Sequence, residues 1–204
     1  MATYPTGSRR IFAVVLAAGE ARRFGSTKQL ACPPGDSESL ARRASRLATE
    51  VCGDRVLLVA GHDSDAVIAG ASPARGFVAI NERYSEGLGT SVACAVRALS
   101  HAADAVLLML ADQPRIGTAH LDRLIRAWTG DDRHVVATAF GDEVGAPALL
   151  PRGAFDRLAA LTGDHGAKTV FGDDDVLLTT LRYDAAAVDV DTPEDLASLA
   201  QSPA

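Results

Sequence analysis

The sequence predicts an α/β protein with a Rossmann-like, doubly wound and mainly parallel sheet in three α/β/α layers. Short apolar runs rich in Val, Leu and Ala recur along the chain, and such runs are typical of strands buried on both faces. Amphipathic helical patterns lie between most of these runs. This alternation of strand and helix favours right-handed βαβ units with helices on both faces of one sheet.

The expected strands follow the apolar runs in chain order. They are 11–17 (IFAVVLA), 55–61 (RVLLVAG), 76–80 (GFVAI), 105–112 (AVLLMLAD), 134–140 (HVVATAF), 147–151 (PALLP), 175–181 (DVLLTTL) and 187–191 (AVDVD). Apolar residues at helical spacing predict helices over 39–51, 90–102 and 118–128. The stretch from Val135 to Leu181 is less regular, and we expect it to cover the mouth of the sheet. We expect a mobile loop over 31–39 (ACPPGDSES) and frayed ends over 1–9 and 201–204.

Length and composition favour one domain over residues 1–204, with an ordered core from residue 10 to residue 200. The chain has 204 residues and is 48% hydrophobic, which is enough for one good core. Its net charge of −6 argues against a general nucleic-acid or membrane-surface binder. Positive charge is concentrated in the first thirty residues, where only Glu20 opposes the following basic residues: Arg9, Arg10, Arg22, Arg23 and Lys28. This pattern indicates a local anion site in an acidic protein.

The cysteines and the N-terminal region bear on the cellular compartment. Cys32, Cys52 and Cys94 are odd in number, widely spaced and form no C-x-x-C, which argues against a disulfide framework or a zinc site. We interpret them as small buried hydrophobes in a reducing cytoplasm. The stretch SRRIFAVVLAAG resembles a twin-arginine export signal. More arginines follow where a cleavage site should lie, so we do not expect export.

The loop after the first expected strand has the composition of a phosphate site. Gly19 and Gly25 flank adjacent arginines in LAAGEARRFGSTK. Glycines let the backbone approach a ligand closely and leave N–H groups free to cradle phosphates. Arg23 and Lys28 supply positive charge, one as a planar fork and the other as a point charge. We expect Lys28 to be exposed and paired with the ligand. The alternative interpretation is a solvated basic loop.

Asp112 directly ends the apolar strand in LLMLADQP. An unpaired carboxylate is costly at such a desolvated position, and a bound cation would compensate. Mg²⁺ prefers one or two carboxylates together with substrate phosphates. The alternative is an Asp that caps the next helix, with Pro114 starting a turn. This segment alone does not separate the two.

Two more aspartates alternate in AVDVDTPEDL. On a strand, Asp189 and Asp191 would share one face, while Thr192 and Pro193 would open a helix. Capping explains one acidic residue but not two on one strand end. We therefore expect Asp191 to be a second metal ligand with Asp112, and Asp189 is the weaker candidate.

The segment EGLGTSVACAV imitates a dinucleotide fingerprint. Gly87 and Gly89 precede a helix, but Val92 stands where the third glycine belongs, and the segment does not open the first βαβ unit. A nicotinamide-type site is therefore not expected. The N-terminal amides of the helix, together with Ser91, are candidates to contact the sugar or base of a nucleotide.

These motifs together resemble the molybdenum cofactor cytidylyltransferase/guanylyltransferase group of nucleotidyltransferases. LAAGEARRFGSTKQL is similar to the signature L-A-A-G-x-S-x-R-x-G-x-x-K, and EGLGTSV, LADQP, GAPALL, GDHGAK and DVDTPEDL follow in order from Ile11 to Leu199. The resemblance implies a nucleotide-diphospho-sugar transferase type of fold, an NTP and Mg²⁺. It also implies transfer of a nucleoside monophosphate to the terminal phosphate of molybdopterin, with release of pyrophosphate.

The sequence departs from this pattern at several positions. Ala21 stands where the signature has Ser, Phe24 replaces the usual Met, and the loop 31–43 differs from the usual segment, which puts substrate handling near it in doubt. Guanylyltransferases of the group usually carry L-A-G-G, whereas Ala18 here gives L-A-A-G. The resemblance therefore favours CTP over GTP.

The resemblance assigns roles to residues of this chain. Arg23, Lys28 and Asp112 are expected to be catalytic, with Asp112 and Asp191 on the metal. The nucleotide is expected to contact the following residues: Leu16, Ala17, Ala18, Gly19, Arg23, Gly25, Lys28, Gly89, Ser91 and Asp112. The acceptor side is expected to include Gly145, Pro147, His165 and Lys168.

The partners that follow are CTP (or GTP), a molybdopterin-type phosphorylated acceptor and a recipient molybdoenzyme, without nucleic acid or membrane. Two alternatives stay open. One is a nucleotidyltransferase for another acceptor, by guanylyl transfer to molybdopterin or by transfer to a sugar or small-acid phosphate. The other is a non-catalytic chaperone that inserts molybdenum cofactor. An NTP screen with pyrophosphate as the readout separates them.

Overall fold

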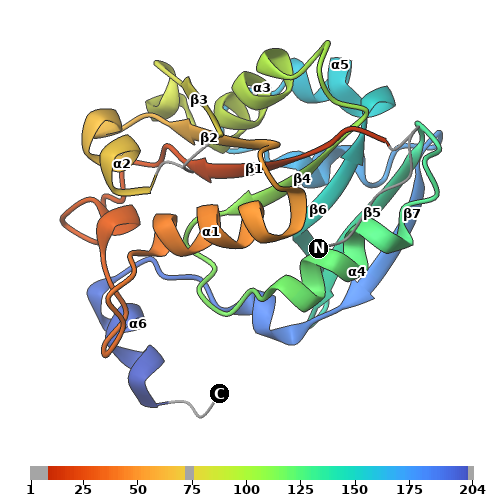
Figure 1. Cartoon of the computed structure of the whole chain (residues 1–204). Coiled ribbons are helices and arrows are strands. Elements are labelled where there is room, and N and C mark those ends of the chain that lie inside the picture. Colours follow the sequence, from red (N-terminus) through yellow and green to blue (C-terminus); the bar gives the residue numbers. More distant parts are fainter. Residues whose placement is uncertain (1–8, 72–75, 202–204) are drawn as a thin grey trace.

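The computed structural model describes residues 9–71 and 76–201, and it confirms the α/β class with a seven-stranded, mainly parallel sheet (Figure 1). The strands lie in the order β3-β2-β1-β4-β6-β5-β7. Their bounds are β1 Ile11–Ala17, β2 Val56–Ala60, β3 Phe77–Ile80, β4 Ala105–Leu110, β5 His134–Phe140, β6 Glu143–Pro151 and β7 Leu177–Arg182. The helices are α1 Leu40–Cys52, α2 Ser64–Ala71, α3 Leu88–Ala98, α4 Thr118–Ala127, α5 Phe155–Ala159 and α6 Pro193–Ser198.

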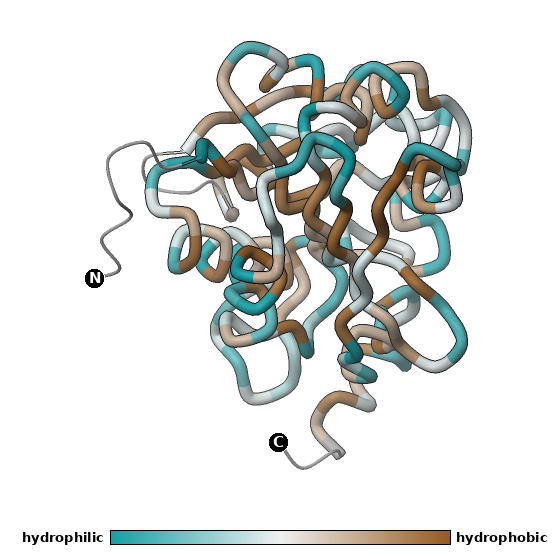
Figure 2. The backbone as a smooth tube through the Cα atoms, turned by 90° about the vertical axis from the view of Figure 1, so that its right-hand side faces the viewer, coloured by the Kyte–Doolittle hydropathy of each residue, from teal (hydrophilic) through white to brown (hydrophobic). Residues whose placement is uncertain are grey.

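The central strands are buried on both faces, as their continuous apolar composition predicts. In β1, Ala13, Val15 and Ala17 pack into a core shared with α1, α2 and α4. Phe12, Val14 and Leu16 point the other way, into a core shared with α3 and α5. Figure 1 shows these two helix layers on opposite sides of the sheet, and Figure 2 shows the hydrophobic strands running through the middle of the molecule. Two cores on one sheet make the three-layer arrangement.

Parallel register brings several strand ends to one edge of the sheet. β1 pairs with β2 so that Ala17 lies opposite Ala60, and with β4 so that Leu16 lies opposite Leu110. The loops that follow these strands therefore start side by side. In an open α/β sheet, ligands bind beyond this carboxyl edge.

The apolar runs did not predict the relative directions of the strands in the sheet. β6 is antiparallel to both of its neighbours, β4 and β5, whereas β7 pairs with β5 in parallel. The stretch from Val135 to Leu181 thus supplies most of three strands, rather than only covering the mouth of the sheet.

The expected strand over 187–191 is wrong. A 3-10 helix spans Asp184–Ala187, and the residues after it belong to no strand before α6 begins at Pro193. Both sides of β4 are already paired, with β1 and β6, so this segment has no free sheet edge beside it. A single backbone hydrogen bond instead ties it to the end of β4, from Val190 N to Asp112 O at 3.0 Å.

Two smaller expectations concern the chain ends and the membrane. Residues 1–8 and 202–204, where we expected frayed ends, lie outside the described residues. Arg9 is described, and its guanidinium donates to the carbonyls of Trp128 and Thr129. No helix in the described part of the chain is long and apolar enough to cross a membrane.

A buried histidine on α4 makes stability depend on pH. His120 is 2% exposed, its Nε2 lies 2.8 Å from Thr138 Oγ1, and its ring stacks on Tyr183. Its Nδ1 has no hydrogen-bond partner among the described residues. Burial, helped by the charge of Arg123, lowers the pKa of His120 to about 4. The folded state therefore disfavours the proton that the unfolded chain binds below about pH 6.5.

We expect stability to fall as the pH drops from 6.5 towards 4, and His120→Gln to remove part of this loss. Between pH 7 and pH 4.5 the variant should lose roughly 2 kcal/mol less of its free energy of unfolding than the wild type. Urea titrations of both proteins at the two pH values measure the difference. Equal losses would show that His120 does not control this window.

Candidate functional site

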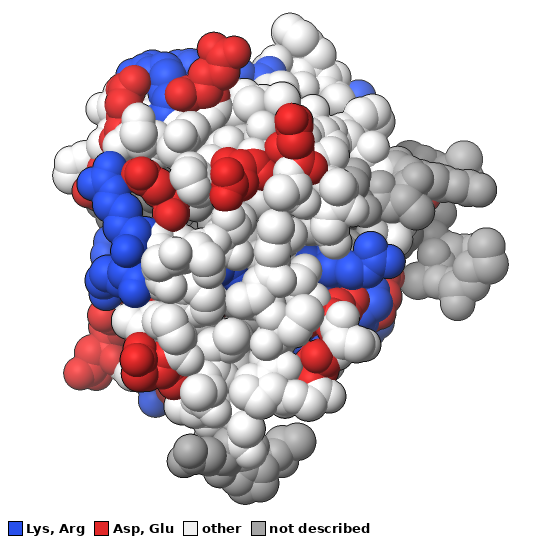
Figure 3. Space-filling model, turned by 90° about the vertical axis from the view of Figure 1, so that its left-hand side faces the viewer, with Lys and Arg blue, Asp and Glu red and all other residues white. Residues whose placement is uncertain are grey.

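A cleft of about 640 Å³ opens at the carboxyl ends of β1 and β4. Expected site residues that line it are Leu16, Ala18, Gly19, Arg23, Lys28, Ser91, Asp112 and Asp191. Figure 3 shows the side of the molecule towards which β1 runs in Figure 1. On it, basic and acidic side chains, several of them next to each other, surround a broad area with few charged side chains. Four segments far apart in sequence thus meet at one edge of the sheet.

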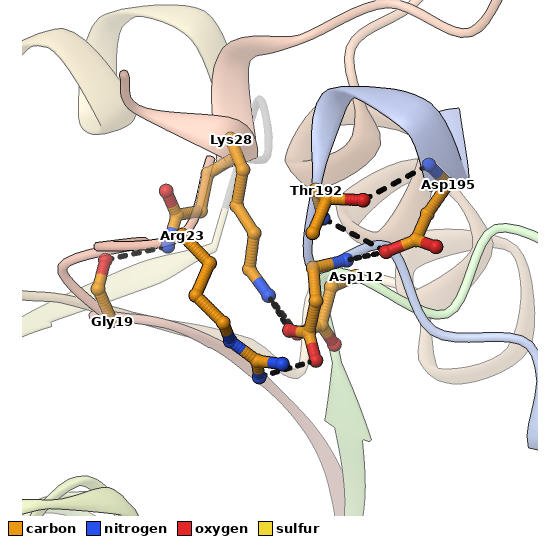
Figure 4. A network of polar contacts seen from close by, with 8 residues as sticks. Gly19, Arg23, Lys28, Asp112, Thr192 and Asp195 are labelled. Atoms are coloured by element: carbon orange, nitrogen blue, oxygen red, sulfur yellow. Dashed lines mark hydrogen bonds and ion pairs between the residues drawn. The ribbon is translucent and has the colours of Figure 1, made fainter. Parts of the chain in front are cut away.

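The loop after β1 folds back on itself. Gln29 donates from Nε2 to the carbonyl of Gly19 at 2.8 Å, which fixes the loop's two ends together. Between them, Gly25 has φ +77°, in the left-handed region that glycine adopts without steric cost. Ala21 also has a positive φ, of 52°, at the position where the signature has Ser. This closed loop directs Arg23 and Lys28 towards the end of β4 (Figure 4).

Lys28 is the centre of the polar network in the cleft. Its Nζ lies 2.7 Å from Asp112 Oδ2 and 2.9 Å from Asp191 Oδ1. The guanidinium of Arg23 meets the other oxygen of Asp191 at 2.6 Å. The Lys28 side chain is only 11% exposed, so the expectation of an exposed lysine is wrong. Its burial is tolerated because both carboxylates neutralise the ammonium.

The charges of these groups are strongly coupled. Burial would lower the pKa of Lys28, but Asp112 and Asp191 outweigh burial and raise it. The hydrogen bond from Lys28 lowers the pKa of Asp191, against burial, and Arg23 adds to this effect. Desolvation, followed by repulsion from Asp112 and Asp191, raises the pKa of Asp189 to about 6, although Lys28 opposes the rise. The three aspartates are therefore coupled to one another and to Lys28.

The donor set suits a divalent cation with few protein ligands. Asp112 Oδ1 is buried and has no hydrogen-bond partner among the described residues. Those residues contain no group of three or more His, Cys, Asp or Glu side chains arranged as a metal site. Asp112 and Asp191 are thus the candidate ligands. Two carboxylates fit Mg²⁺, which completes its coordination with water and substrate phosphates.

Asp195, which sequence reasoning missed, fixes the backbone of Asp191. Its Oδ2 accepts hydrogen bonds from Asp191 N at 3.1 Å and Thr192 N at 2.8 Å, while Thr192 Oγ1 accepts from Asp195 N (Figure 4). This is a capping box at the start of α6. The spacing Thr192-x-x-Asp195 was the sequence signal for it. The capping box thereby fixes the position of Asp191, which lies in a loop.

Several expected site residues do not line the cleft: Ala17, Gly25, Gly89, Gly145, Pro147, His165, Lys168 and Asp189. Ala17 packs on the opposite face of the sheet. The amide of Gly89 donates to Gly163 O at 2.9 Å, so it is engaged within the protein. Of the GDHGAK segment, Asp164 lines the cleft, whereas His165 and Lys168 are exposed. Gly145 and Pro147 lie on β6.

The opposite wall of the cleft includes two residues, Tyr84 and Ser85, that were not expected from the sequence. It comes from the segment after β3 and the start of α3, with Tyr84, Ser85, Glu86, Gly87 and Leu88 in the lining. Glu20, Ala21, Arg22 and Gln29 also line the cleft from the β1 loop. Glu86, Gly87 and Leu88 belong to EGLGTSV, and the lining residues of the β1 loop belong to LAAGEARRFGSTKQL. Tyr84 and Ser85 lie in no motif, and the fold brings them to the cleft.

Residues 13–179 match the family described as "MobA-like NTP transferase domain". The chain belongs to this family. It is therefore a nucleotidyltransferase, which favours an enzyme over the alternative of a non-catalytic chaperone. This agrees with the expected resemblance to molybdenum cofactor nucleotidyltransferases.

Curated and solved relatives cover nearly the whole chain. "Purine catabolism protein PucB" of Bacillus subtilis (strain 168) is 30% identical over 91% of this chain and 93% of its own. The crystal structure of Rv0371c from Mycobacterium tuberculosis H37Rv superposes with a TM-score of 0.82 and 28% identity, over 96% of this chain and 99% of that one. Another structure of Rv0371c is a complex with manganese (TM-score 0.76, 27% identity, 95% and 100% coverage). A nucleotidyl transferase from Methanothermobacter thermautotroptrophicus, 24% identical with a TM-score of 0.77 over 92% and 94% of the two chains, shares the fold.

We expect Lys28→Met to destabilise the protein in metal-free buffer and Mg²⁺ to reverse part of the loss. Without the ammonium, Asp112 and Asp191 repel each other, and the loss should be about 1–3 kcal/mol. A divalent cation between them would replace the missing charge. Thermal melts of wild type and variant, with and without MgCl₂ at constant ionic strength, measure this rescue.

Arg46→Met is a matched control, because Arg46 pairs with Glu38 and Glu50 on the exposed side of α1. Its melt should not respond specifically to Mg²⁺. A Lys28→Met melt that is also indifferent to Mg²⁺ would contradict a metal site on these carboxylates.

Proposed function

We propose that the protein transfers CMP from CTP to the phosphate of molybdopterin in a Mg²⁺-dependent reaction that releases pyrophosphate. One observation carries the catalytic part of the proposal. Lys28 and Arg23 on the β1 loop face Asp112 and Asp191 across one cleft, with ion pairs of 2.6–2.9 Å. Phosphoryl-type transfer requires positioning and charge neutralisation more than covalent catalysis.

Each of these residues has a role in the proposed reaction. Arg23 and Lys28 bind the triphosphate, and Asp112 and Asp191 hold Mg²⁺, which would neutralise the charge that develops on the phosphates. Asp195 orients Asp191 through its backbone amide. The acceptor phosphate oxygen attacks the α-phosphorus in line, so that a new P–O–P link forms as the bond to the pyrophosphate breaks. Gly145, Pro147, His165 and Lys168 stay proposed for the acceptor side.

The choice of CTP depends on Ala18. Ala18 lines the cleft but is only 2% exposed, because it packs against neighbouring residues of the cleft wall. A Cβ at Gly61 would approach Ala18 Cβ to 2.9 Å and Tyr84 Cβ to 2.7 Å, so the three residues are in close contact. The methyl group of Ala18 thereby fills space behind the cleft surface. This supports a smaller base site than the L-A-G-G pattern would give.

Purified protein with Mg²⁺, CTP and molybdopterin should release pyrophosphate, and omission of either substrate should abolish the release. Product mass then identifies the cytidine dinucleotide. The same assay with sugar phosphates and small phosphorylated acids in place of molybdopterin tests the other acceptors. Release with one of these and none with molybdopterin would overturn the acceptor and keep the enzyme class.

We expect Ala18→Gly to shift base preference towards GTP. Loss of one methyl group from an apolar wall changes discrimination by about 1–3 kcal/mol at most, so the ratio of kcat/KM for CTP to that for GTP should fall roughly tenfold. Competition between the two nucleotides in one reaction measures the ratio directly. A wild type that uses GTP as well as CTP would contradict the assignment of the base.

A further inference from the structure

We propose that Asn81 is a positioning residue that makes the Ser91 hydroxyl a hydrogen-bond donor towards the base of the nucleotide. The inference rests on the proposed function, since it names how that same cleft recognises its nucleotide. Asn81 follows β3 directly, is 5% exposed and is absent from every motif of the sequence. Its backbone amide donates to Ala60 O at the end of β2.

The hydrogen bonds of Asn81 fix which way its amide group points. Arg83 N lies 3.0 Å from the side-chain oxygen of Asn81. A backbone N–H can only donate, so the atom that faces it must be the oxygen, Oδ1. The NH₂ group then faces α3, where it lies 2.8 Å from Thr90 Oγ1 and 3.0 Å from Ser91 Oγ. Both of its protons are used.

Thr90 and Ser91 accept from the same amide but differ in what they donate to. The Thr90 hydroxyl lies 2.9 Å from the carbonyl oxygens of Arg83 and Gly87, so its proton stays within the protein. Ser91 is among the residues that line the cleft, and its hydroxyl makes no hydrogen bond as a donor to any described residue. Asn81 donates to the oxygen of Ser91, so the one proton of the Ser91 hydroxyl is available to a ligand.

This arrangement selects the chemistry of the ligand atom that meets Ser91. A fixed donor pairs with a carbonyl oxygen or an unprotonated ring nitrogen and leaves an amino group without a partner. Cytosine presents O2 and N3 as acceptors and its 4-amino group as a donor. The structure therefore assigns Ser91 to the O2 and N3 side of the base, with Asn81 setting the direction of the hydrogen bond.

Equilibrium binding of CTP with Mg²⁺, without acceptor, tests the inference. Ser91→Ala should weaken binding roughly three- to tenfold, the value of one neutral hydrogen bond. Asn81→Asp should weaken it at least as much, because a carboxylate takes the Ser91 proton and turns lone pairs towards the base. In a Ser91→Ala background, Asn81→Asp should weaken CTP binding by a further factor of less than about two, because Asn81 acts on the ligand only through the Ser91 hydroxyl.

Thr90→Val is the matched control for a structural role. It removes the other hydroxyl that accepts from Asn81 and should lower the melting temperature while leaving CTP affinity within about twofold. In turnover, Asn81→Asp should raise KM for CTP and leave kcat at saturating CTP close to that of the wild type.

3-Deazacytidine triphosphate, which lacks N3, distinguishes the two acceptors. If the wild type binds this analogue weakly and Ser91→Ala does not weaken its binding further, the acceptor is N3. If Ser91→Ala weakens binding of the analogue as much as it weakens binding of CTP, the acceptor is O2.

The possible failures are distinguishable. A wild type that binds no CTP would overturn the proposed function. A wild type that binds CTP, with Ser91→Ala unchanged, would overturn this inference alone. Additive effects of Asn81→Asp and Ser91→Ala, or an equal loss of affinity in Thr90→Val, would make Asn81 purely structural. If Asn81→Asp does not fold, Asn81→Ala, which removes the donor without adding charge, must lose most of its effect in the Ser91→Ala background.

Discussion

The rest of the site depends on the ion pairs that the Lys28 ammonium group forms with Asp112 and Asp191. They join segments that are 84 and 163 residues away in sequence. Asp112 is placed by the register of β4, but Asp191 lies on a segment outside the sheet and needs further support. That support comes from Val190 N bound to Asp112 O and from the capping box of Asp195. An ion pair of this kind is costly to bury, so both partners must be held precisely.

The same interaction implies a competition within the proposed reaction. One ammonium cannot neutralise two carboxylates and a triphosphate equally well at the same time, and a divalent cation competes for the same carboxylate oxygens. Metal on Asp112 and Asp191 would free the charge of Lys28 for phosphate. Phosphate on Lys28 would in turn leave the carboxylates more negative. The binding of the two ligands is thereby coupled, and by linkage the coupling is equal in both directions.

The sequence predicted most of the fold but less of the site. β1 and β5 have the expected bounds because each is a long apolar run with a paired strand on both sides, and such runs specify burial on both faces. Hydrophobic periodicity carries no information on strand direction, so the sequence did not predict that β6 is antiparallel. The alternation of Asp189 and Asp191 suggested a strand, but a strand also needs a free partner edge, which β4 does not offer. Lys28 was expected to be exposed and paired with ligand. Its burial could not be predicted because the carboxylates that neutralise it are remote in sequence.

The two ends of the cleft are built on different physical grounds, which explains why the motifs described one end more fully than the other. The end that holds Arg23 and Lys28 depends on charge, so it requires particular residue types at a strand end, and these are visible in the sequence. The opposite wall depends on close backbone approach and on a buried amide. A Cβ at Gly87 would lie 2.3 Å from Gly163 C, and one at Gly89 would lie 2.7 Å from His165 O. The glycines that imitated a dinucleotide fingerprint thus serve to seat the 162–165 loop on α3. Asn81 also orders the first turn of that helix through its hydrogen bonds to Thr90 and Ser91, so this wall is set by packing and hydrogen-bond direction rather than by charge.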